Sequence, residues 1–354
     1  MSFIFAAVVV LLFIGIKPQI SMRDDYISLK QTHAINGFFI ILVFLRHFNQ
    51  YVELQNPCDK LFLNANELLG QLIVTTFMFY SGYGVVISIL KKGKDYLKNI
   101  PFQRILKTMV LFDIAILFYV LTNIILHIHQ TVPQVLLSFI GWEGVGNSTW
   151  YIFAILVMYL ITYVSFMAGD MFRIKHNDIV KCMIATCLVG AYILVIKRFK
   201  DSQYYNTVMC YAMGMWFAVL QKYIDKLMKN NKLYVLALIG CTALFAFAAV
   251  FRESNLLINQ LYYLVFVAVV VLITMRVRFG NPVLDWCGSN LLGLYILQRL
   301  PMLVIQRQFV GMNVYLFFAL SLVISLVMTW LYSKYVMSAV NKVFKKKPPV
   351  ATGG

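Results

Sequence analysis

One ionisable side chain at the end of an apolar segment is the first candidate for chemistry. His47 closes a run of mostly apolar residues that begins at Ala34, and Arg46 precedes it. Ionisable groups are costly in hydrocarbon, so those that persist usually face a bundle interior or a water-filled cavity. Imidazole also has the pKa that suits a general base at neutral pH. The alternatives are a polar residue tolerated at the water interface for His47 and a snorkelling side chain for Arg46.

Two other polar residues could line a cavity through the membrane. Asn36 shares a helical face with His47 but lies three turns away, about 16 Å along the axis. A residue at the start of a helix is the alternative for Asn36. Ser81 stands beside Gly82 and Gly84, and small residues of this kind allow neighbouring helices to approach closely. Ser81 therefore faces either a helix neighbour or a substrate channel.

Charged and aromatic residues at the ends of apolar segments suggest binding of polar ligands. Arg104 and Lys107 share one helical face, where they could hold an anionic phosphate group. The alternative is that cations at the cytoplasmic end of a membrane span reflect only the membrane topology. Glu143 lies near Trp150 and Tyr151, and a carboxylate among aromatic rings is a common way to grip sugars. Aromatic residues at a membrane interface also serve simply as anchors.

The helices that must position these residues are membrane spans. Hydrophobic residues make up 61% of the chain and charged residues 13%, about half the charged share of a soluble domain. We predict an all-α polytopic membrane bundle of about 10–11 transmembrane helices. The expected segments are 2–16, 34–51, 71–90, 105–127, 149–168, 179–197, 204–221, 232–250, 256–275, 286–306 and 312–335.

The excess of positively charged residues indicates the membrane topology of the chain. The chain has 31 Lys and Arg against 14 acidic residues, and most of these cations fall in alternate loops. This positive-inside bias predicts the N-terminus outside and the C-terminus in the cytoplasm, with anionic lipid rather than nucleic acid as the partner. No spacing of Cys and His indicates a metal site or a disulfide, so we expect no metal.

We expect three parts in the chain and no attached soluble domain. Residues 1–30 form an additional N-terminal transmembrane helix and its connecting loop. Residues 31–340 form the main helical domain. Residues 341–354 are a basic cytoplasmic tail, and its last residues look like a cloning linker.

Five segments together resemble the integral-membrane acyltransferase 3 family, in matching order from about residue 30 to 305. The matching segments are Gly37–Phe48 (an apolar helix ending in His), Phe77–Tyr83 (a Phe-Phe-x-x-Ser-Gly-Phe-like helix), Arg104–Lys107 (a basic stretch), Thr149–Ala154 (a Trp-Phe-x-x-Ala-like helix) and Asn290–Gln298 (a Ser-Leu-x-x-Tyr-Leu-x-His-like pattern).

The resemblance implies O-acylation of an extracytoplasmic glycan or glycolipid with an acyl-CoA, most simply acetyl-CoA, as donor. His47 would be the general base, and Ser81 would contact or carry the acyl group. Arg104, Lys107 and Asn36 would bind the donor, and Glu143, Trp150, Tyr151 and Gln298 the acceptor.

Two positions depart from the family pattern. Asn36 stands where the family usually has Arg, and Gln298 stands where its last motif usually ends in His. Both departures remove a cationic or titratable group.

The sequence leaves two other functions open. The first is a transporter of polysaccharide or lipid-linked sugar, although no internal repeat supports it. The second is an inactive scaffold in an exopolysaccharide export system. In each case we expect a multi-pass protein of a bacterial plasma membrane, with polysaccharide synthesis or export proteins as partners.

Overall fold

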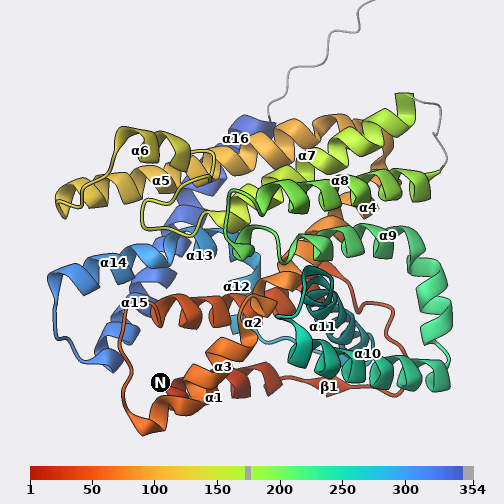
Figure 1. The fold of residues 1–354 in the computed structure, drawn as a ribbon, viewed down its shortest axis with the longest axis horizontal. Coiled ribbons are helices and arrows are strands. Elements are labelled where there is room, and N and C mark those ends of the chain that lie inside the picture. The colour runs from red at the N-terminus through yellow and green to blue at the C-terminus, as the bar shows by residue number, and fades with distance from the viewer. Residues whose placement is uncertain (172–176, 346–354) are drawn as a thin grey trace, which may run out of the picture. The chain divides into compact units, whose positions relative to one another are not determined.

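The computed structural model describes residues 1–171 and 177–345. Most of the described chain is helical, which confirms the all-α polytopic fold class (Figure 1). The loop cations Arg173 and Lys175 and most of the predicted basic tail, at 346–354, lie outside the described residues. The helices are α1 Ser2–Phe13, α2 Leu29–Phe48, α3 Lys60–Leu69, α4 Leu72–Ile100, α5 Lys107–Ile125, α6 Val132–Ser138, α7 Trp150–Met171, α8 Asp178–Ile196, α9 Val208–Met228, α10 Asn231–Phe251, α11 Leu256–Arg276, α12 Pro282–Ser289, α13 Leu291–Leu297, α14 Arg299–Gln308, α15 Val314–Leu331 and α16 Ser338–Lys345.

Shorter elements connect the helices. One antiparallel pair of two-residue strands, β1 Lys17–Pro18 and β2 Val277–Arg278, joins segments far apart in the sequence. Short 3-10 turns cover Pro57–Asp59 and Ser202–Tyr204, and π-helical turns cover Pro101–Leu106 and Tyr332–Met337.

Every predicted apolar segment contains helix, but the segment 286–306 is broken between α12, α13 and α14. Six helical stretches in the described part of the chain are long and apolar enough to cross a membrane, or seven if a bent pair counts as one span. This is fewer than the 10–11 helices expected. The stretch Pro57–Ile125 counts once, although α4 and α5 both lie within it. The helix α1 is only 12 residues long, and α2 carries the ionisable residues Lys30, His33, Arg46 and His47.

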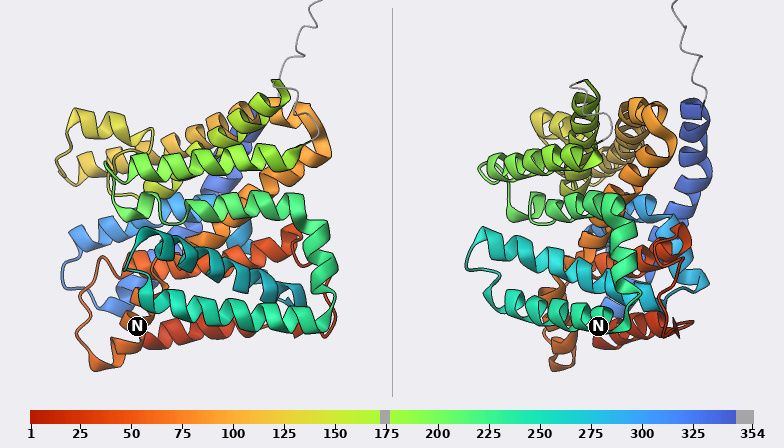
Figure 2. Two further views of the ribbon diagram at one scale, coloured as in Figure 1. Left: turned by 45° about the vertical axis from the view of Figure 1, so that its right-hand side comes forward. Right: turned by 90° about the vertical axis from the view of Figure 1, so that its right-hand side faces the viewer.

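The chain divides into two compact units. The first unit comprises Met1–Leu97 with Ile161–Leu291, and the second comprises Lys98–Leu160 with Leu292–Gly354. Within the first unit, α8 runs beside α9, and α10 runs beside α11 (Figure 2). Glycines set the closest helix crossings there. A Cβ at Gly37 on α2 would lie 1.9 Å from the Leu284 oxygen of α12, and one at Gly214 on α9 would lie 2.0 Å from the Phe79 oxygen of α4.

The second unit is held by contacts of the π-helical turn before α5 and of the C-terminal helices. The rings of Phe102 and Phe344 lie 4.5 Å apart, and the Gln103 amide donates to the Phe344 carbonyl at 2.8 Å. The hydroxyl of Tyr332 donates to the carbonyl of Leu111 on α5. These contacts fix α16 against the π-helical turn and the beginning of α5, which carry the predicted donor-binding cations Arg104 and Lys107.

Candidate functional site

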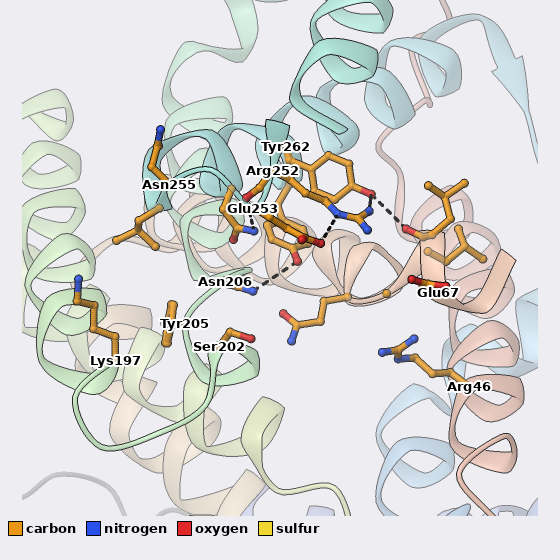
Figure 3. Close-up of a pocket in the computed structure, with 17 residues that line it drawn as sticks. Arg46, Glu67, Lys197, Ser202, Tyr205, Asn206, Arg252, Glu253, Asn255 and Tyr262 are labelled. Carbon is orange, nitrogen blue, oxygen red and sulfur yellow. Dashed lines mark hydrogen bonds and ion pairs between the residues drawn. The ribbon is translucent and has the colours of Figure 1, made fainter. Parts of the chain in front are cut away.

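The first unit contains a polar pocket of about 660 Å³ at the ends of several helices (Figure 3). It is bounded by the end of α2, the end of α3, the segment after α8 and the turn between α10 and α11. Arg46 and Glu67 lie on one side of the close-up, and Lys197, Ser202 and Tyr205 lie on the other. The lining residues are Arg46, Glu67, Leu68, Leu69, Gly70, Gln71, Lys197, Ser202, Tyr205, Asn206, Arg252, Glu253, Asn255, Leu256, Asn259, Tyr262 and Tyr263.

Arg46 is held by protein rather than by the membrane surface. Its Nη1 donates to the Asn66 carbonyl at 2.7 Å, near the end of α3. That helix ends at Gly70, whose φ of 45° lies in the region that favours glycine. The Asn66 carbonyl also accepts the Gly70 N–H at 3.2 Å, and the partial negative charge at a helix C-terminus makes a guanidinium there favourable. A protein contact therefore holds Arg46 in the wall of the pocket, and snorkelling toward the membrane surface alone does not explain its position.

A second wall is organised around Tyr262. The Tyr262 hydroxyl donates to the Leu68 carbonyl at 3.2 Å and accepts from Arg252 Nη1 at 3.4 Å. The ring of Tyr262 stacks on Phe245, with centroids 5.2 Å apart and planes at 10°. Arg252 also pairs with Glu253 at 3.7 Å. Tyr262 is thus fixed by packing on one side and hydrogen bonds on the other.

Side-chain amides supply the remaining polar surface. Asn259 donates to the Arg252 carbonyl at 3.3 Å, and Asn206 donates to the Tyr263 hydroxyl at 3.5 Å. The side-chain oxygens of Gln71 and Asn259 are buried without a hydrogen-bond partner among the described residues. Buried polar atoms normally bond protein, water or ligand. These two oxygens are therefore suited to accept hydrogen bonds from hydroxyl groups of a ligand.

His47 borders this pocket along the chain but does not line it. Its side chain is buried in the last turn of α2, with 6% of its surface exposed. The His47 carbonyl accepts the backbone N–H of Gln50 at 2.9 Å, where the helix ends. Consecutive helical residues point about 100° apart, which separates the directions of Arg46 and His47. The partial negative charge at a helix C-terminus favours a positively charged imidazolium.

The other two predicted residues of the first unit are placed differently. Asn36 is half-buried, and its side-chain oxygen is buried without a hydrogen-bond partner in the described part of the chain. It sits inside α2 rather than at its start, since Ser28 caps that helix by accepting from the Gln31 N–H. Ser81 is half-buried on α4. Its neighbour Gly82 packs against the α9 backbone, where a Cβ would lie 2.1 Å from the Tyr211 oxygen.

The predicted donor-binding cations come together in the second unit. Arg104 lies in the π-helical turn, and Lys107 begins α5 one turn later. The charges of Arg104 and Lys345 both act on Lys107, so these three residues form one basic cluster. Lys345 is the last residue of α16 and is absent from the residues predicted for the site. Its signal in the sequence, a run of lysines near the end of the chain, indicates only topology.

The predicted acceptor-binding residues also lie in the second unit. Glu143 and Trp150 are half-buried. Tyr151 is buried and packs against Tyr295 of α13, with ring centroids 5.2 Å apart. Three residues after Tyr295, Gln298 is completely buried, and both polar atoms of its amide lack hydrogen-bond partners within the described chain. A buried amide in this state indicates a place for water or a ligand group.

Several polar residues escaped the sequence analysis. Lys197, Arg252, Asn259 and Tyr262 of the pocket stand near the ends of predicted spans, where a polar residue has an ordinary interfacial explanation. Asp113 lies inside the predicted span 105–127, and one of its oxygens is buried without a hydrogen-bond partner among the described residues. An ionisable residue inside a span was the available signal. Within the described chain, no group of three or more His, Cys, Asp or Glu side chains is placed to hold a metal ion.

Comparison with known proteins identifies the family. Residues 32–334 match the model of an acyltransferase domain, that of the acyltransferase 3 family. No curated protein and no solved structure matches the chain. The matched region covers α2 to the π-helical turn after α15, and it contains all of the predicted site residues. The chain belongs to the acyltransferase 3 family.

Proposed function

We infer that this multi-pass membrane acyltransferase transfers an acyl group, most simply acetyl, from acyl-CoA to a hydroxyl of an extracytoplasmic glycan or glycolipid. The observation that carries the acceptor assignment is the pocket beside Arg46. The charge pattern of the loops predicts that this pocket opens on the outer face, where such a glycan would be presented.

The pocket has the size and chemistry of a sugar site. Its volume of about 660 Å³ falls in the range of small-molecule sites, about 300–1,000 Å³. Sugars offer many hydroxyl groups, each able to donate and accept one or more hydrogen bonds. Gln71 and Asn259 present acceptor oxygens, and Glu67 presents a carboxylate in the same lining. Tyrosine rings such as Tyr205 offer flat apolar faces for the C–H face of a sugar ring.

His47 is the proposed general base. A hydroxyl is a poor nucleophile at neutral pH, so the base takes its proton as the oxygen attacks the thioester carbonyl. The new C–O ester bond forms, the C–S bond breaks, and the leaving CoA thiolate receives the proton from the imidazolium. The position of His47 in the last turn of α2 supports this role, because the helix dipole stabilises the transient positive charge.

The donor is proposed to bind at the basic cluster of Arg104, Lys107 and Lys345. Guanidinium and ammonium groups recognise phosphates through charge-assisted hydrogen bonds, and CoA carries several phosphates. Asn36, with its unpartnered oxygen, is also proposed as a donor-binding residue. Ser81 is proposed to contact the acyl group. A plasma membrane of a bacterium, with polysaccharide synthesis proteins as partners, is the setting in which this reaction is expected.

The acceptor pocket is tested by removing one of its unpartnered amide oxygens, that of Gln71. Gln71→Ala should raise the KM for the glycan while leaving the KM for acetyl-CoA unchanged, because only the acceptor contacts that side chain. Gln50→Ala is the matched control, since Gln50 is an exposed amide that does not line the pocket. Equal KM values for the glycan in the two variants would remove the pocket from acceptor binding.

A further inference from the structure

A second cavity in the first unit shares no residue with the acceptor pocket. It encloses about 390 Å³ between the end of α1, the start of α2 and the start of α12. Three of its residues are cations, and one is a carboxylate. The lining residues are Gly15, Lys17, Lys30, Arg278, Phe279, Gly280, Asn281, Pro282 and Asp285. We call this cavity the basic cleft.

The walls of the basic cleft are held in place by the backbone. Lys17 of β1 pairs with Arg278 of β2 in the short antiparallel ladder. Gly15, with a φ of +81°, lies so close to Gly280 that a Cβ would be 2.6 Å from its oxygen. The Asn281 amide donates to the Leu11 carbonyl at 2.9 Å, and its oxygen caps α12. One residue thus ties the end of α1 to the start of α12.

The charges in the cleft are not neutralised by neighbours. Lys17, Lys30 and Arg278 are exposed, and none of them forms an ion pair with another residue of the described chain. Asp285 is half-buried, and its Oδ1 is buried without a hydrogen-bond partner among the described residues. A ligand that fits must carry negative charge for the three cations and also a hydrogen-bond donor for Asp285.

Apolar side chains that lie close to cleft residues in the sequence are exposed. Phe13 and Ile14 directly precede the cleft residue Gly15 and have 58% and 54% of their surfaces exposed. Ile20, just beyond β1, is 85% exposed. A soluble nucleotide would gain nothing from these side chains. The hydrocarbon tails of a lipid would cover them, because every residue of α1 after Ser2 is apolar.

We propose that the basic cleft is a binding site for the headgroup of an anionic phospholipid that carries hydroxyl groups, such as phosphatidylglycerol. The phosphate contacts Lys17, Lys30 and Arg278, and a glycerol hydroxyl donates to Asp285. The acyl chains lie along α1. This inference stands independently of the proposed acyl transfer.

A lipid bound in the basic cleft would also stabilise the position of α2. The helix α12 begins at the cleft and packs against α2 at the crossing of Gly37 with Leu284. Gly288 makes a second close approach, where a Cβ would lie 1.9 Å from the His33 oxygen. Because α2 carries His47, a lipid in the cleft would support the helix that presents the proposed base.

The test measures lipid retention by the full chain purified in an uncharged detergent. Short-chain phosphatidylglycerol is titrated and bound lipid is counted by native mass spectrometry, with phosphatidylcholine as the neutral comparison. Each Lys or Arg near an anionic headgroup contributes roughly a fivefold gain in affinity. We therefore expect Lys30→Gln to weaken phosphatidylglycerol binding about fivefold, and the combined K17Q/K30Q/R278Q variant to lose selective binding. The variant K222Q/K226Q/K229Q removes the same charge from exposed positions of the first unit and should bind normally.

Two further experiments identify the chemical class of the ligand. Asp285→Ala should remove the preference for phosphatidylglycerol over phosphatidic acid, which lacks the glycerol hydroxyls, while keeping phosphate-dependent binding. Adenosine 3′,5′-bisphosphate is added as a soluble phosphate probe. Competition by this probe for the cleft would assign it to a nucleotide and overturn the proposal. Equal lipid binding by the cleft variant and its charge-matched control would overturn it as well.

Discussion

The crossing of α2 with α12 leads to a sharp prediction about Gly37→Ala. A Cβ at this position would lie 1.9 Å from the Leu284 carbonyl oxygen, whereas ordinary contact begins at 3.4 Å. The two backbones would have to separate by about 1.5 Å to restore contact distance. Backbone atoms cannot rotate away as a side chain can, so the strain is carried by the helices themselves. Overpacking of this kind typically costs about 1–3 kcal/mol.

The same displacement should reduce catalysis. Because α2 carries His47 near its end, a shift of the helix moves the proposed base, and a misplacement of about 1 Å can cost roughly 100-fold in rate. The assay combines the apparent melting temperature in detergent with the rate of acyl transfer. Gly84→Ala is the matched control, because a Cβ there meets nothing within 4 Å. Alanine also favours helix by about 1 kcal/mol over glycine, so this control should be neutral or slightly stabilised. If Gly37→Ala behaves like Gly84→Ala in both measurements, the tight crossing does not constrain α2.

Two other predictions concern the donor cluster and a polar network in the first unit. Replacing Arg104 and Lys107 together by Gln should raise the KM for acetyl-CoA with little change in the KM for the glycan; the reverse pattern would move the donor elsewhere. Tyr26→Phe should lower the stability by about 1–3 kcal/mol, measured as a melting temperature, because the Tyr26 hydroxyl donates to Asp225 Oδ1 at 2.7 Å. Burial, together with the bond to Asp225, raises the pKa of Tyr26, so it remains a protonated donor and the loss should be the same at pH 7 and pH 9. A melting temperature of Tyr26→Phe equal to that of the wild type would contradict that role.

The helical architecture could be predicted from the sequence because apolar stretches are long and their signal is additive along the chain. The short helices α3 and α6 were missed because each has fewer apolar residues than a span requires. The break within 286–306 was missed for a different reason. Hydropathy averages over Asn290, whereas the local backbone ends α12 at this residue.

The candidate site was only partly accessible to sequence reasoning. Arg104 and Lys107 were found because neighbouring cations share a helical face over one turn, which is a local property. The partnership of Lys107 with Lys345 depends on α16 returning to α5, which no local pattern reports. Arg46 was interpreted as snorkelling because its partner, the Asn66 carbonyl, belongs to a backbone whose position only the fold determines. The pocket around Tyr262 likewise gathers residues from four separate segments.

The most direct test of the proposed mechanism is the transfer of radiolabelled acetyl from acetyl-CoA into extracytoplasmic glycan. Membranes that contain the wild-type chain are compared with membranes that contain equal amounts of His47→Ala. The mechanism predicts labelled glycan in the first and a loss of about 100- to 10,000-fold in the second, the usual contribution of a general base. Undiminished transfer by His47→Ala would remove His47 from the chemistry. Absence of label from the wild type would contradict the proposed donor and acceptor together.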